Sequence, residues 1–229
     1  MTDVEPRPHP AKYSKPILDY LRQHVNELHD ASGRMVTTVL DPMAGVGGIH
    51  ELQEPLKIIT WGVELEPEWA AQHHDTYEGD ATNLEQWMDK SIDIVCFSPP
   101  YGNRMADQFN SKDPNRREVT YKHFLGRRLD ERSVAGLQWG QHYMTTMSKV
   151  LIECKRVCRG EIIINVSDFI RNRQVVPVVD WYVERMLSLG YAVVADWAIG
   201  TSRMRFGANS KLRVECERVI TFRLQRFRD

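Results

Sequence analysis

Long apolar runs are missing from this chain of 229 residues: no stretch of 18 or more apolar residues occurs, so the sequence predicts no transmembrane helix. The N-terminal region is polar and rich in proline, and it lacks the apolar segment of a secretory signal peptide. No internal repeat and no low-complexity tract is present. These absences exclude membrane-spanning and repeat proteins, and they lead us to expect a globular protein of the cytoplasm without a membrane partner.

Cysteine is also scarce. The four cysteines are Cys96, Cys154, Cys158 and Cys216, and their scattered spacing favours free thiols in a reducing compartment over a disulfide framework. Cys154 and Cys158 are one helical turn apart, but no second pair of cysteines or histidines has matching spacing. We therefore expect no metal site.

What the chain does contain is an alternation of strand and helix patterns. Its hydrophobic fraction of 42% is sufficient for a core, and its length suits one α/β domain with an insertion. Apolar, β-branched runs predict strands at residues 35–40, 58–63, 92–97, 161–166, 191–199 and 214–224. Helical patterns are found at residues 15–28, 67–74, 134–157 and 175–189, the last of them stopped by Gly190. The last two strands are expected to form an antiparallel pair.

The most informative motif is the tetrapeptide Ser98-Pro99-Pro100-Tyr101, which directly follows the apolar run 92–97. Two prolines end a strand because neither has an N–H to donate. A hydroxyl, a carbonyl and an aromatic ring then lie at one rigid point at the carboxyl end of a strand, where open α/β sheets bind ligands. The two oxygens can accept the hydrogens of an exocyclic amine, and the ring can stack on a planar base.

A glycine-rich loop, Asp41-Pro42-Met43-Ala44-Gly45-Val46-Gly47-Gly48, joins the predicted strand 35–40 to the following helix. Glycine lets the backbone approach a ligand closely and adopt positive φ. No Gly-Lys-Ser/Thr follows, so this is not a P-loop, and the glycine spacing differs from that of the dinucleotide fingerprint. The motif predicts a ligand-binding loop of another type.

Acidic residues follow the next two strands. Glu64 ends the strand 58–63, one βαβ unit after the glycine loop, where a carboxylate can accept both hydroxyls of a ribose. Glu66 and Glu68 are expected in the first turn of a helix, where their charge complements the helix dipole. Asp80, in Gly79-Asp80-Ala81, is expected after a third strand.

In this order, the motifs resemble those of S-adenosylmethionine-dependent DNA amino-methyltransferases, which carry Ser/Asp/Asn-Pro-Pro-Tyr/Phe at the place of residues 98–101. Serine is most familiar there in cytosine-N4 enzymes, and Asp or Asn in adenine-N6 enzymes. The cofactor loop of the family usually reads Asp-Pro-Phe-x-Gly-x-Gly, and Met43 replaces that phenylalanine. The segment His9-Pro-Ala-Lys-Tyr13 resembles the stretch over the methionine end of the cofactor, although Ser14 stands where a proline is expected. The matches cover residues 9–101.

The resemblance implies S-adenosyl-L-methionine as the cofactor. It implies an α/β fold: a single-domain class I (Rossmann-like) methyltransferase over residues 1–229, with a seven-stranded, mostly parallel sheet and a terminal antiparallel hairpin. The implied cofactor-binding residues, with Asp80 on the adenine amine, are Tyr13, Asp41, Met43, Ala44, Gly45, Gly47, Glu64, Asp80 and Ala81. The implied catalytic residues are Ser98, Pro99, Pro100 and Tyr101.

Charge is distributed unevenly although the formal net charge is only −1. Residues 1–101 hold 7 basic and 17 acidic residues, whereas residues 102–160 hold 12 basic and 6 acidic ones. The positive charge begins just after the Ser-Pro-Pro-Tyr turn, where a polyanion would approach if its base entered the site. We expect residues 102–142 to contact DNA, together with a second basic cluster in the loop 200–213. The predicted DNA-binding residues are Arg104, Arg116, Arg117, Lys122, Arg127, Arg128, Arg203 and Arg205.

These observations predict a DNA methyltransferase that acts on the amine of a flipped base in double-stranded DNA, cytosine N4 foremost. Ser98 and the Pro99 carbonyl would bind the amine, and Tyr101 would stack on the base. No cysteine follows the proline pair, which argues against the carbon-5 mechanism. Three alternatives stay open: adenine-N6 methylation, RNA guanine-N2 methylation, and a nucleic-acid-binding relative without catalysis. The resemblance suggests the cytoplasm of a prokaryotic cell or of a phage-infected host; the residues identify neither a restriction endonuclease partner nor an oligomeric state.

Overall fold

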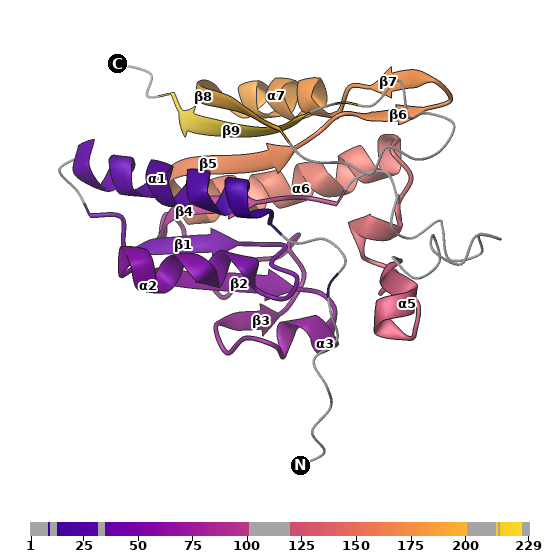
Figure 1. Cartoon of the computed structure of the whole chain (residues 1–229), viewed down its shortest axis with the longest axis horizontal. Coiled ribbons are helices and arrows are strands. Elements are labelled where there is room, and N and C mark those ends of the chain that lie inside the picture. The colour runs from indigo at the N-terminus through magenta and orange to yellow at the C-terminus, as the bar shows by residue number, and fades with distance from the viewer. Residues whose placement is uncertain are drawn as a thin grey trace, which may run out of the picture.

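The computed structural model of the chain describes residues 9, 13–31, 35–100, 120–200, 214 and 216–225. Seven of its strands form one sheet in the order β3-β2-β1-β4-β5-β9-β8 (Figure 1). Their bounds are β1 (Thr38–Asp41), β2 (Ile59–Glu64), β3 (Thr76–Glu78), β4 (Ile92–Phe97), β5 (Cys158–Val166), β8 (Tyr191–Gly200) and β9 (Cys216–Leu224). The helices are α1 (Lys15–Ala31), η1 (Gly48–Leu52), α2 (Gln53–Leu56), α3 (Pro67–Ala70), α5 (Tyr121–Leu125), η3 (Val134–Gly136), α6 (Gln141–Val157) and α7 (Val178–Ser188).

The first five strands of the sheet are parallel. β1 pairs with β2 and β4, β2 pairs with β3, and β4 pairs with β5, all in parallel. β9 runs antiparallel between β5 and β8. This confirms the predicted α/β sheet of seven mostly parallel strands with a terminal antiparallel hairpin. The carboxyl ends of five strands therefore meet at one edge of the sheet.

Helices cover both faces of the sheet (Figure 1). Leu21 of α1 and Ile49 of η1 are fully buried on one face, together with Ile163 of β5. Met147 of α6 and Tyr182 of α7 are fully buried on the other face. Side chains on a strand point alternately to its two faces, so the apolar run of β5 supplies both layers.

The helix expected over 15–28 extends to Ala31, and two other predicted helices are shortened or interrupted. The helix expected over 67–74 ends at Ala70, because the chain has to turn before Thr76 can pair with β2. The helix expected over 134–157 is interrupted, and α6 begins only at Gln141. Trp139, in the interruption, packs against Trp181 and against Tyr143 of α6, and this tertiary packing overrides the helical periodicity.

A second, two-stranded sheet was missed by the sequence prediction. β6 (Phe169–Arg171) and β7 (Gln174–Val176) form a hairpin, so the helix expected from residue 175 begins at Val178 instead. The two turn residues, Asn172 and Arg173, have φ values of 51° and 64°. Two successive left-handed residues are typical of the type I′ hairpin turn. Among the described helices, none is long and apolar enough to cross a bilayer.

Candidate active site at the carboxyl edge of the sheet

A row of polar side chains follows the carboxyl edge of the sheet. Asp41 and Glu64 are the last residues of β1 and β2, and Asp80 lies two residues after β3. Ser98 directly follows β4, and Asn165 is the last residue but one of β5. The fold thus brings the glycine loop, Glu64, Asp80 and Ser98 to the carboxyl ends of four neighbouring strands.

The glycine loop after β1 is folded back against β2. The Met43 N–H donates to Asp41 Oδ1 at 2.8 Å, and the Ala44 N–H donates to the Val63 carbonyl at 2.9 Å. Gly45 and Gly47 have φ values of 56° and 82°, which favour glycine. The helix expected after the loop begins as the 3₁₀ turn η1 and continues directly into α2.

The N-terminal segment crosses this loop. A Cβ added to Gly45 would lie 3.3 Å from the ring of His9, and one added to Gly48 would lie 3.2 Å from Tyr13. The Tyr13 hydroxyl donates to Asp41 Oδ2 at 2.9 Å. Burial raises the pKa of Asp41 to about 7, against the hydrogen bonds from Met43 and Tyr13. His9 and Tyr13 therefore lie over the loop, and the role that the resemblance implies for their segment, covering the methionine end of the cofactor, stays a prediction.

Both carboxylate oxygens of Glu64 accept backbone hydrogen bonds, one from the glycine loop and one from the turn that follows β2. Oε2 accepts from the Gly45 N–H at 2.9 Å, and Oε1 accepts from the Glu66 N–H at 2.9 Å. Each oxygen keeps a second lone pair, so the group can still accept two hydroxyl hydrogens. Burial raises the pKa of Glu64 to about 7, opposed by these backbone bonds.

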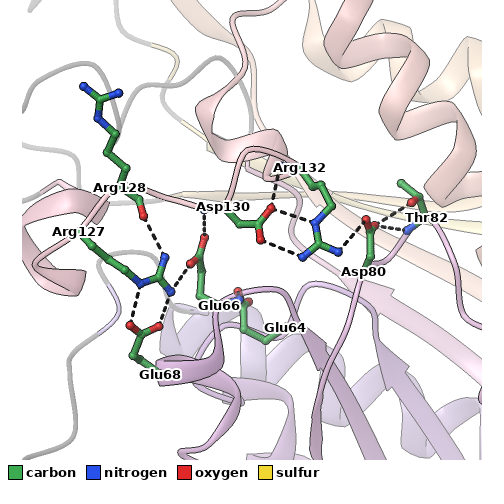
Figure 2. Close-up of polar contacts among 9 residues, drawn as sticks. All are labelled: Glu64, Glu66, Glu68, Asp80, Thr82, Arg127, Arg128, Asp130 and Arg132. Atoms are coloured by element: carbon green, nitrogen blue, oxygen red, sulfur yellow. Dashed lines mark hydrogen bonds and ion pairs between the residues drawn. The ribbon is translucent and has the colours of Figure 1, made fainter.

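Asp80 is oriented by its own turn. Its Oδ1 accepts from the backbone N–H and the hydroxyl of Thr82, both at 2.8 Å. Its Oδ2 lies 3.9 Å from Arg132 Nη1 (Figure 2). Ala81, beside it, is buried. Together with Glu64, Asp80 supplies the acceptors that a ribose and an adenine amine require, so these residues fit an adenosyl group.

The turn after β4 is held by tyrosines of the helices α6 and α7. Ser98 is half-buried and Pro99 is buried. The hydroxyl of Tyr143 in α6 donates to the Pro100 carbonyl at 2.8 Å, and it lies 2.7 Å from the hydroxyl of Tyr182 in α7. Since Tyr143 has one hydrogen, Tyr182 donates to Tyr143. Tyr101 lies outside the described residues.

Sequence reasoning missed two polar residues beside Ser98. The Nδ2 of Asn165 donates to Ser98 Oγ at 3.3 Å and to Glu217 Oε2 at 3.0 Å. Asn165 is only 3% exposed. The signal was present in the sequence, because Asn165 interrupts the apolar run 162–166 of a predicted buried strand.

The basic segment after α5 is attached to the acidic cofactor side of the sheet (Figure 2). The Arg127 guanidinium bonds both oxygens of Glu68 and forms an ion pair of 2.7 Å with Glu66, which is 1% exposed. Glu66 also accepts from the Asp130 N–H at 2.8 Å. Glu66 and Glu68 lie at the start of α3, as predicted, but no local pattern in the sequence indicates their basic partner.

The predicted DNA-binding residues therefore differ in their surroundings. Arg127 is engaged with two carboxylates, whereas the exposed side chain of Arg128 extends away from the acidic cluster (Figure 2). Lys122 is half-buried in α5. The remaining five lie outside the described residues: Arg104, Arg116, Arg117, Arg203 and Arg205.

A histidine group lies beneath the glycine loop. His50, His73 and Asp75 bring three potential metal-ligand atoms within 4.8 Å of one another. The rings of His50 and His73 are stacked with centroids 3.7 Å apart and planes 12° apart, so one ion cannot lie in the plane of both. Both His50 nitrogens are hydrogen-bonded to threonine hydroxyls, at 2.6 and 2.8 Å. The group packs under the loop, where a Cβ on Gly47 would come within 2.5 Å of His50.

Comparisons with known proteins identify the fold. No protein-family model and no curated protein matches the chain. Among solved structures, the PH0226 protein of Pyrococcus horikoshii OT3 has a TM-score of 0.51 at 14% identity, over 93% of this chain and 92% of that one. The structure of the protein Thermoplasma acidophilum 1320 has a TM-score of 0.51 at 9% identity, over 90% of this chain and 86% of that one. An S-adenosylmethionine-dependent methyltransferase from Clostridium acetobutylicum ATCC 824 has a TM-score of 0.50 at 10% identity, over 89% and 90%.

The chain has a Rossmann-like methyltransferase fold. At these identities the similarity establishes the fold, and the chemistry has to be argued from the site itself. The site combines a glycine loop, acceptors at two further strand ends and a rigid Ser-Pro-Pro turn. This arrangement can hold an adenosyl group on β1 to β3 and an amine at β4.

Proposed function

We propose that this protein is a DNA amino-methyltransferase, which transfers a methyl group from S-adenosyl-L-methionine to the exocyclic amine of a flipped base, cytosine N4 foremost. One observation carries the proposal: the Ser98 turn and the glycine loop leave the carboxyl ends of the adjacent strands β4 and β1. A methyl donor on the loop and an amine at the turn would therefore be neighbours.

The residues at β1 to β3 fit this cofactor, which when bound supplies an electrophilic methyl group on a sulfonium sulfur. Glu64 would accept the ribose hydroxyls with the second lone pair of each oxygen, and Asp80 would accept from the adenine amine. Gly45 and Gly47 let the loop adopt positive φ, which most side chains disfavour, and in this conformation its backbone could approach the ligand closely. His9 and Tyr13 would cover the methionine end.

At the substrate end, the chain's own acceptors would orient the amine. Ser98 Oγ and the Pro99 carbonyl would bind its hydrogens, turn its lone pair towards the methyl group and stabilise the positive charge that develops on nitrogen. Tyr101 would stack on the base. The choice of cytosine over adenine rests on serine at the first position of the motif.

The DNA assignment rests on the charge that begins after the turn. Arg128 is exposed, Lys122 is nearby in sequence, and residues 102–160 carry 12 basic against 6 acidic residues. Phosphate contacts from such a segment would hold the duplex while a base enters the site. Arg127, bound to Glu66 and Glu68, would instead fix the segment to α3.

Single-turnover methyl transfer with Ser98→Ala tests the proposal. The substitution removes one acceptor for a developing charge, so the rate should fall about 100-fold, as for loss of an oxyanion-hole donor. Cofactor affinity should be unchanged, and Ser98→Asp should retain part of the activity because it keeps an acceptor. Ser91→Ala, at the amino end of the same strand, is the matched control and should have the wild-type rate. A Ser98→Ala enzyme as fast as wild type would contradict the assignment.

A further inference from the structure

We infer that Asn165 is a specificity-determining residue, which accepts a hydrogen bond from the exocyclic amine of the base and so distinguishes an amine from a carbonyl at that position. The inference rests on the proposed function, because it assumes that a base is bound at the Ser98 turn. It assigns to Glu217 the role of fixing the Asn165 side-chain amide in the orientation that accepts.

Three adjacent strands bring the group together. β5 lies between β4 and β9 in the sheet, and the register places Phe97 beside Ile164 and Val166 opposite Arg218. Ser98 follows Phe97, and Glu217 precedes Arg218, so both flank the end of β5 where Asn165 lies. Residues separated by 67 and 52 positions thus meet at the catalytic turn.

Glu217 determines which way the amide faces. An ionised carboxylate only accepts, so the NH₂ group of Asn165, and not its oxygen, has to face Glu217 Oε2 at 3.0 Å. The same NH₂ group donates to Ser98. The Oδ1 atom is left buried without a hydrogen-bond partner among the described residues. A buried acceptor without a partner is uncommon in native structures, and a donor from a ligand bound at the turn would satisfy it.

The exocyclic amine of a base at the turn is such a donor. Its two hydrogens diverge by about 120°, so acceptors at about 2.9 Å from the nitrogen lie roughly 5 Å apart. Nδ2 of Asn165 is 3.3 Å from Ser98 Oγ, and its Oδ1 is about 2.2 Å from Nδ2. The two acceptors are therefore at most about 5.5 Å apart, within reach of one amine. Ser98 would accept one amine hydrogen, and Asn165 Oδ1 would share the other with the Pro99 carbonyl in a three-centre hydrogen bond.

Ser98 alone could not discriminate between an amine and a carbonyl. A hydroxyl both donates and accepts, so it can adapt to the carbonyl of uracil by rotating its hydrogen. The fixed Asn165 amide offers only its oxygen, which would face a uracil carbonyl without a hydrogen between them. Such a mismatch leaves a buried acceptor unpaired and weakens binding.

Binding of short single-stranded oligonucleotides tests this inference without any catalysis. Ten-residue oligodeoxycytidine and oligodeoxyuridine would be titrated by calorimetry in the presence of saturating S-adenosylhomocysteine, which carries no methyl to transfer. We expect wild type to bind the cytosine strand about tenfold more tightly or better. Asn165→Leu and Glu217→Gln should both reduce the ratio to about threefold or less, the second because a glutamine can donate and lets the Asn165 amide reverse.

Glu161→Gln is the matched control, since Glu161 is a buried carboxylate on the same strand that pairs with Arg223 away from the turn. It should leave the cytosine-to-uracil ratio unchanged. If Asn165→Leu fails to fold, the binding ratio of Glu217→Gln decides the test. Glu217 is only half-buried, so this variant is expected to fold. Equal binding of both strands by wild type, or an unchanged ratio in the folded variants, would overturn the inference.

If the proposed function were wrong but the inference about Asn165 right, the experiments would give a different result. Wild type would then prefer the cytosine strand and yet transfer no labelled methyl group from S-adenosylmethionine to it. Conversely, wild type could transfer methyl groups while the variants keep its cytosine-to-uracil binding ratio. The proposed function would then be supported, and the role proposed for Asn165 would be wrong.

Discussion

At the scale of single residues, two carboxyl groups, one buried and one half-buried, determine how the proposed cofactor site responds to pH. Asp41 and Glu64 end the neighbouring strands β1 and β2, and burial raises the pKa of each to about 7. Glu64 is thus partly protonated near neutral pH in the absence of ligand. Ribose hydroxyls bind better to its ionised form, so cofactor binding and loss of the Glu64 proton are linked.

The affinity for S-adenosylmethionine should therefore increase as pH is raised from 6 to 8. Glu64→Gln should remove the part of this increase that Glu64 contributes, leaving only that of Asp41. Glu64→Ala should weaken binding about tenfold or more, because it removes charge-assisted hydrogen bonds of about 1.5–3 kcal/mol each. Calorimetric titration at several pH values measures both effects. A folded Glu64→Ala variant with wild-type affinity would remove Glu64 from the site.

Tyr143 provides a second test at this scale. Tyr143→Phe removes the donor to the Pro100 carbonyl, so we expect a loss of about 1–3 kcal/mol in the free energy of unfolding. The single-turnover rate should fall as well, because the Ser-Pro-Pro turn loses its support. Tyr182→Phe keeps the bond to Pro100 and should have the smaller effect on the rate. Urea denaturation and rate measurements would contradict this account if the two variants behaved alike.

At the scale of elements, the segment that follows α5 is attached to the acidic side of the site, at α3 and Asp80. Arg127 and Asp130 bind the acidic start of α3, and Arg132 lies near Asp80 (Figure 2). His9 contacts both Trp69 of α3 and Tyr121 of α5 through their rings. The segment predicted to contact DNA is therefore packed against the elements that are proposed to hold the cofactor.

Substitution of Arg127 should affect mainly stability, whereas substitution of Arg128 should affect mainly DNA binding. Arg127→Ala leaves the buried Glu66 without this partner, and we expect a loss of about 1–2 kcal/mol in unfolding free energy, between the values for exposed and buried pairs. Arg128→Ala should leave stability unchanged but weaken DNA binding and lower the slope of log affinity against log salt by about 0.9. Thermal or urea unfolding and salt-dependent DNA titrations test the pair. The same salt slope in Arg128→Ala as in wild type would make this side chain a solvated surface group.

Elements that depend on local pattern could be predicted from the sequence. β4 was predicted at its observed bounds, because Ile92–Phe97 is a compact apolar run ended by two prolines. The interruption before α6 could not be predicted, since it depends on Trp139 packing against Trp181 of another helix. The β6–β7 hairpin was hidden because Arg173 is not a usual residue for a left-handed turn position.

The same distinction applies to the site. The glycine loop, Glu64 and Ser98 were predicted because each stands at the end of an apolar run, whereas Asp80 was predicted only through the family resemblance, since no apolar run precedes it. The supporting contacts join residues far apart in the chain, such as Tyr143 with Pro100 and Arg127 with Glu66. Neither pair has a local pattern, so only the folded chain brings them together.

At the scale of the whole molecule, the charge changes sign along the chain. The half that holds the glycine loop, Glu64 and Asp80 has a net charge of −10, whereas residues 102–160 have a net charge of +6. A cationic sulfonium ligand and a polyanionic substrate would each meet the opposite charge on their side of the site. The sheet places these two sides next to each other at its carboxyl edge.

Identifying the modified base tests the central claim most directly. The wild-type protein would be incubated with unmethylated bacterial genomic DNA and S-adenosylmethionine labelled in its methyl group, the DNA would be digested to nucleosides, and the products would be identified by mass spectrometry. The account predicts labelled N4-methyldeoxycytidine, reduced about 100-fold in rate with Ser98→Ala. Label on adenine N6 would retain the amine chemistry and change the base. Label on carbon 5 of cytosine, or no label in any deoxynucleoside, would contradict the account.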